Sequence, residues 1–161
     1  MRLLPLLGFL LLPFATAADF DDNPKITIAA MLTSQGDMAF LNKPKDRRFD
    51  GATASMSRVA YGGHIRAIPE EKKKYLDQYF VGARHQPEAA ALFTDEILVR
   101  EGKQEYWLPI QTPVLAYFRK EVKAGEPVDL YLVLIVSFVA KGGDIVHVMG
   151  VNEFAVPSRS K

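Results

Sequence analysis

Residues 128–140 read VDLYLVLIVSFVA, and this stretch decides the fold more than any other part of the chain. Apolar side chains occupy both sides of its alternation, so a strand formed here has to be covered on both faces. We therefore expect Leu132 and Leu134 to be buried at the centre of a sheet. The glycine turn over 141–144 and the apolar run over 145–156 predict a second long strand that returns as a hairpin.

Further strands are expected upstream of this hairpin, although their patterns are shorter. The residues involved are rich in β-branched and aromatic side chains and are bounded by turn residues. They are 25–32, a hairpin over 52–68 that turns at Gly62 and Gly63, and a hairpin formed by 97–99 and 105–108.

Helices are expected where proline or threonine starts an apolar stripe of helical period and glycine ends it. These stretches are 69–82 and 112–125, with a short third helix over 87–93. Lys72, Lys73 and Lys74 are interpreted as the solvated face of the first helix. The elements together predict an α+β domain, built on a largely antiparallel mixed sheet or a small barrel of about seven strands with two to three short helices.

The first residues predict export. Met1-Arg2, a leucine-rich run and the small residues at 15–17 form the three parts of a signal peptide, which we expect to be cleaved after Ala17. Residues 18–24 are then a flexible lead-in, 25–156 a single domain and 157–161 a frayed tail. No stable membrane span is expected after cleavage. The lack of cysteines and of glycosylation sequons favours a bacterial periplasmic or secreted protein.

Composition removes several classes of function. With 20 basic and 19 acidic residues the net charge is only +1, which argues against a nucleic-acid partner. The three histidines have no metal-ligand spacing, so we expect no metal site, and no nucleotide fingerprint points to a cofactor. Neither a serine elbow nor a spaced pair of acids marks a catalytic centre. His147 lies in an apolar strand and is expected to be packed, with one ring nitrogen satisfied.

Binding residues are expected in two places. Tyr106, Trp107 and Gln111 lie where a predicted hairpin meets a helix, and aromatic side chains there are candidate anchors of a partner groove. Lys45, Arg47 and Arg48 lie in a long predicted loop over 33–50, and loops of this length are uncommon unless they are functional or disordered.

These observations favour a non-catalytic binding protein of the bacterial cell envelope, with an envelope protein as its partner. One alternative is a carrier of a small apolar ligand inside the sheet. The other is a periplasmic hydrolase that uses His64 or His85 with a carboxylate brought close by folding. The sequence leaves both alternatives open.

Overall fold

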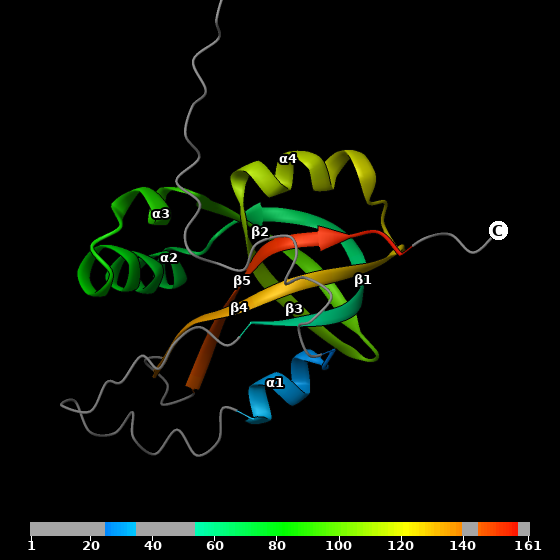
Figure 1. Cartoon of the computed structure of the whole chain (residues 1–161), viewed down its shortest axis with the longest axis horizontal. Helices are drawn as coiled ribbons and strands as arrows, with labels where there is room; N and C mark the ends of the chain where they lie inside the picture. Colours follow the sequence, from blue (N-terminus) through cyan, green and yellow to red (C-terminus); the bar gives the residue numbers. More distant parts are fainter. Residues whose placement is uncertain (1–24, 35–53, 140–144, 158–161) are drawn as a thin grey trace, which may run out of the picture.

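Five strands close into a barrel in the order β1-β2-β3-β5-β4. The structure, a computed structural model, describes residues 25–34, 54–139 and 145–157. In chain order the elements are α1 (Ile28–Ser34), β1 (Ala54–Ala67), α2 (Glu70–Asp77), the π-helix η3 (Gln78–Ala83), α3 (Pro87–Ala91), β2 (Phe93–Glu101), β3 (Gln104–Gln111), α4 (Thr112–Glu121), β4 (Pro127–Val139) and β5 (Ile145–Ala155). Figure 1 shows α4 and α1 on opposite sides of the barrel, with α2 and α3 beside it.

The α+β class and the small mixed barrel are confirmed, whereas the expected strand number is wrong. Neighbouring strands pair antiparallel except β3 and β5, which run parallel and meet through Ile110 and Val151. The helix between β3 and β4 covers one end of the barrel, and this arrangement is the topology of an OB-fold. The predicted signal peptide, the lead-in, residues 35–50 of the predicted loop, residues 51–53 and residues 158–161 lie outside the described residues.

One strand replaces the hairpin that was expected over 52–68. β1 runs on through Gly62 and Gly63, and it pairs with β4 along its first half and with β2 along its second. A register shift between Tyr61 and Ile65 marks a bulge, in which Gly63 has the positive φ of 80° that glycine tolerates best. The two glycines therefore bend a strand at a barrel corner instead of turning a hairpin.

The stretch expected as a first strand is mostly the helix α1. Thr27 caps this helix, because its hydroxyl oxygen accepts a hydrogen bond from the backbone N–H of Ala30 at 2.9 Å. The carboxylate of Glu101, the last residue of β2, accepts from the N–H groups of Ile28 and Ala29 at 2.8 and 3.2 Å. This second cap comes from a residue more than 70 positions away, so local β-propensity gave the wrong element.

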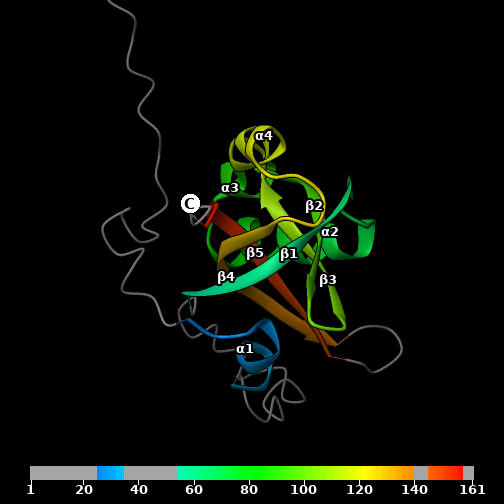
Figure 2. The ribbon, with the colours of Figure 1, turned by 90° about the vertical axis from the view of Figure 1, so that its right-hand side faces the viewer.

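The barrel is filled by apolar side chains and closed at both ends by helices. Leu132 of β4 is fully buried inside it, as expected, and so is Leu130. Leu115 and Phe118 of α4 enter from one end, and α1 contributes two fully buried side chains to the same cluster. Figure 2 shows these two helices at opposite ends in a second view. The interior is thus a core, as in other small barrels.

Leu134 is only partly buried, contrary to expectation, because the pairing of β4 with β5 shifts immediately after it. The outer face of β4 is covered, as predicted, by a second apolar cluster that includes Ile135 and Val148. Side chains of α2, η3 and α3 form the rest of that cluster, among them Leu76 and Phe80. The expected helices over 69–82, 87–93 and 112–125 and the hairpins at 97–108 and 128–156 are thereby confirmed in outline.

Among the described residues, no helix has both the length and the apolarity that are needed to cross a membrane.

Candidate functional site

The outer face of β2 and β3 carries the most unusual side chains of the described barrel. Alternate residues of these strands point into the core, so the intervening ones share the outer face. The outward residues are Glu96, Leu98 and Arg100 on β2, and Glu105, Trp107 and Pro109 on β3. Next to the turn between β2 and β3, this face carries an exposed ion pair, in which Arg100 Nε lies 2.8 Å from Glu105 Oε1.

Glu96 is a carboxylate with no exposed surface, and it is held by two cations. Arg66 of β1, directly opposite it in the register, places Nε at 2.7 Å and Nη2 at 2.6 Å from Glu96 Oε1. Lys72 of α2 places Nζ 2.5 Å from Glu96 Oε2. A buried carboxylate needs such partners, because leaving water costs several kcal/mol per ion. The cluster contains two cations and one anion and therefore carries one net positive charge.

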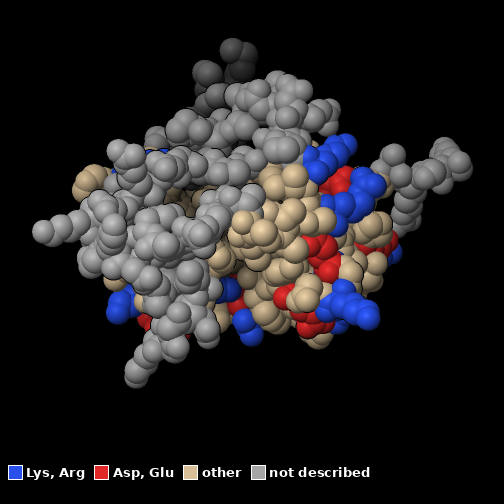
Figure 3. All heavy atoms as spheres, turned by 90° about the horizontal axis from the view of Figure 1, so that it is seen from below, with Lys and Arg blue, Asp and Glu red and all other residues tan. Residues whose placement is uncertain are grey.

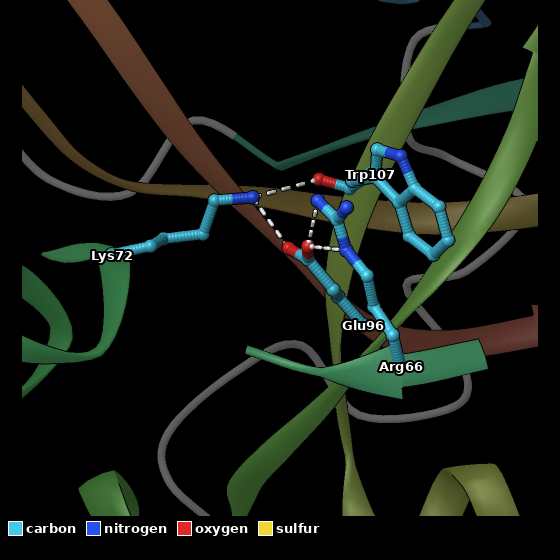
Figure 4. A network of polar contacts seen from close by, with 4 residues as sticks. All are labelled: Arg66, Lys72, Glu96 and Trp107. Carbon is cyan, nitrogen blue, oxygen red and sulfur yellow. Dashed lines mark hydrogen bonds and ion pairs between the residues drawn. The ribbon is translucent and has the colours of Figure 1, made fainter. Parts of the chain in front are cut away.

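Arg66 also stacks on the only tryptophan of the chain. Its guanidinium carbon lies 3.8 Å from the centroid of the Trp107 ring, which is within cation–π distance. Figure 4 shows the guanidinium between the indole ring and the carboxylate of Glu96. The Arg66 side chain is still 47% exposed. The contacts with Trp107 and Glu96 therefore restrain the guanidinium, while part of the Arg66 side chain faces solvent.

Lys72 ties α2 to the barrel through the same carboxylate. Besides Glu96, its ammonium group donates to the backbone carbonyl of Trp107 at 3.2 Å. The expectation that Lys72, Lys73 and Lys74 form a solvated face is wrong for Lys72, whose side chain is only 17% exposed. Lys73 forms an ion pair with Asp77 at 3.0 Å on the helix surface, and Lys74 is exposed.

The structure separates the three binding residues that were predicted at the hairpin. Tyr106 is half-buried and packs against the barrel core, and desolvation raises its pKa above the ordinary value of 10.0. Trp107 lies on the opposite face, as adjacent strand residues must. Gln111 lies at the other end of β3, where its amide donates to Asn152 Oδ1 at 2.8 Å. Lys45, Arg47 and Arg48 lie outside the described residues.

Sequence reasoning missed the three charged residues of this site. Glu96 directly follows Asp95, and adjacent residues on a strand face opposite ways, so the pair gives no sign of a shared acidic site. Local sequence gives little sign of Glu96, because its strand also contains Asp95, Arg100 and Glu101; only its complete burial, which glutamate almost never shows without a partner, singles it out. No sequence signal connects Glu96 with Arg66 and Lys72, because 30 and 24 residues separate them.

Charges on the described surface are mixed. Viewed from below, basic and acidic side chains alternate around uncharged areas, with no large field of one sign on the visible part (Figure 3). Long-range electrostatic steering needs such a field.

The histidines do not form a catalytic group in the described residues. His64 and His85 are exposed, and no contact joins either ring to a carboxylate there. His147 is packed as predicted: Ser137 Oγ lies 2.7 Å from its Nδ1, and burial lowers its pKa below 6.5. Within the described ranges, no three His, Asp or Glu side chains gather as metal ligands. Burial raises the pKa of Glu153.

No family model matches this chain, and no curated protein matches it either.

Proposed function

We propose that this chain is an exported, non-catalytic binding protein of the bacterial cell envelope, which engages a protein partner through the outer face of β2 and β3. One observation carries the proposal: the Arg66 guanidinium lies over the Trp107 ring and is held there by the fully buried carboxylate of Glu96. Tryptophan and arginine are the side chains that contribute most often to binding hot spots.

The energetics of the cluster support a role beyond stability. Replacing a buried ion pair with apolar side chains of similar volume is often neutral or stabilising, so an apolar group would attach α2 to the barrel equally well. Such a group would not leave a half-exposed guanidinium in a fixed orientation. Rigid presentation of a contact group lowers the entropy cost of binding. The arrangement of Arg66 is therefore better suited to recognition than to holding a helix.

Two further considerations support the same proposal. In OB-folds the face of strands 2 and 3 binds oligonucleotides and oligosaccharides, which supports this face as a binding surface by analogy at the level of the fold alone and does not indicate the kind of partner. The leader-like sequence at 1–17 supports export, and with it the envelope as the place of binding.

The other two candidate functions have less support. A carrier needs space for an apolar ligand, while apolar side chains of the strands, α1 and α4 fill the barrel. The hydrolase alternative uses His64 or His85, and both side chains are exposed without a carboxylate contact among the described residues. A hydrolase of the Ser–His type would also need a group that orients the histidine. Ser137 and His147 are close enough, but among the described residues no carboxylate contacts that ring.

Photocrosslinking tests the proposal. A benzoyl-phenylalanine is placed at Glu105, which is exposed on the proposed face, and in a second protein at Tyr117, which is 61% exposed on α4. After irradiation in envelope extract of the producing organism, the position 105 protein should give a discrete adduct that Trp107→Ala abolishes. The position 117 protein should not give that adduct. Equal adducts from both positions, or an adduct that survives Trp107→Ala, would contradict the proposal.

A further inference from the structure

We infer that Arg66 binds a carboxylate of an acidic segment of the partner, and this inference rests on the proposed function. A guanidinium has five N–H donors arranged as a fork. Nε and Nη2 of Arg66 face Glu96. Nη1 has no polar partner among the described residues, although almost half of the side chain is exposed. The edge that carries Nη1 is therefore open to an acceptor from outside.

The orientation of this edge is already set. Glu96 holds the inner edge of the guanidinium, and the Trp107 ring supports one of its faces at 3.8 Å. Arginine and carboxylate prefer a planar, two-pronged contact, which requires the guanidinium plane to be fixed. A side chain fixed in this way loses little rotamer freedom when an acidic group arrives.

The charge of the cluster favours a carboxylate over a phosphate. Arg66 and Lys72 together carry two positive charges, and Glu96 removes one of them. The net charge of +1 matches the single negative charge of a carboxylate. A phosphate carries up to two negative charges, which is more than the single positive charge of the cluster can balance. An acidic peptide segment is therefore the occupant to which the site is complementary.

Trp107 gives a direct assay, because it is the only tryptophan in the chain. The protein is titrated with an N-acetylated, C-amidated hexapeptide of glutamate, and indole emission is followed under selective excitation. The matching glutamine hexapeptide and inorganic phosphate are titrated in parallel. We expect a saturable change with the glutamate peptide, and at least about tenfold weaker binding of the other two probes.

Variants of Arg66 test the contact itself. Arg66→Gln should weaken glutamate-peptide binding at least about tenfold, and Arg66→Lys should weaken it about threefold or more, since lysine keeps the charge without the fork. Arg58→Gln is the matched control: Arg58 also pairs with a carboxylate, that of Asp129, but is not stacked on Trp107, and it should bind like the wild type. Circular dichroism checks that each variant is folded.

Three results would overturn the inference: equal binding of the glutamine peptide, preferential binding of phosphate, or undiminished binding by folded Arg66→Gln. If any of these appears while the crosslink from position 105 still depends on Trp107, the proposed function stands and only the carboxylate assignment fails. Loss of that crosslink dependence would instead remove the binding face itself.

Discussion

Replacing Glu96 with glutamine should destabilise the protein by about 2–3 kcal/mol. The carboxylate has no exposed surface and accepts from Arg66 and from Lys72. Removing one member of a buried ion pair costs roughly 3–5 kcal/mol, because the remaining charge is left uncompensated. Here the cost is reduced, since the Arg66 side chain is 47% exposed and that of Lys72 is 17% exposed, so that both can reach water. For a domain of this size, the loss corresponds to a fall of roughly 5–10 °C in the melting temperature.

Urea unfolding measures this loss with two probes. Trp107 emission reports on the site, and far-ultraviolet circular dichroism reports on the whole fold. Both probes are needed, because release of Arg66 from the indole ring can change the emission without unfolding. Coincident transitions establish that unfolding is two-state and that the free energies can be compared.

Asp129→Asn provides the matched control for Glu96→Gln. Asp129 also lies on a barrel strand and accepts two hydrogen bonds from an arginine, Arg58, at 2.6 and 2.7 Å. Among the described residues Asp129 pairs with one cation, Arg58, whose side chain is 63% exposed, whereas Glu96 pairs with two cations. Asp129→Asn should therefore cost clearly less stability than Glu96→Gln. If Glu96→Gln proves neutral, or no more harmful than Asp129→Asn, then Glu96 does not anchor the cluster and the argument for a fixed Arg66 is lost.

Three further predictions test the core and the pH dependence. Leu132→Ala should cost about 2–5 kcal/mol in urea unfolding, since Leu132 is fully buried, and a loss below about 1 kcal/mol would contradict its place in the core. Gly150→Ala should cost roughly 1–3 kcal/mol, because its new Cβ would lie 2.6 Å from Ile135 Cδ1; combining it with Ile135→Val should cost less than the two changes added. Burial lowers the pKa of His147 below 6.5, so the folded state binds fewer protons than the unfolded chain and stability should fall as the pH drops through and below that value. Thermal melts across this range should show a smaller fall in His147→Gln but an unchanged one in the exposed His64→Gln.

The parts of the fold that sequence predicted correctly are those that local signals determine. The β4–β5 hairpin follows from alternation and a glycine turn. α4 follows from a threonine-proline start, an apolar stripe and basic residues in its last turn. In each case the neighbouring residues that define the element also stabilise it, so no distant contact was needed to predict it.

The errors arose where distant residues decide the local structure. α1 exists because Glu101 caps its first turn and because Ile28 and Met31 fit the end of the barrel. The candidate site was found only in part for the same reason. Trp107 is recognisable in the sequence as an aromatic residue on a hairpin. Its partner Arg66 lies in β1 beyond Gly62 and Gly63, where the sequence predicts a hairpin turn instead of a continuous strand beside β2.

The bulge in β1 determines which side chain reaches the buried carboxylate. Tyr61 pairs with Val99 and Ile65 pairs with Ile97, so four steps along β1 match two along β2. Continuous pairing from Tyr61 would place His64 opposite Glu96. The two extra residues of the bulge leave the inward and outward faces unchanged, because the side-chain period is two, but they move the register so that Arg66 takes that position. The glycines that misled the strand prediction are therefore part of what builds the arginine site: they allow the bend that sets a guanidinium, rather than an imidazole, beside Glu96.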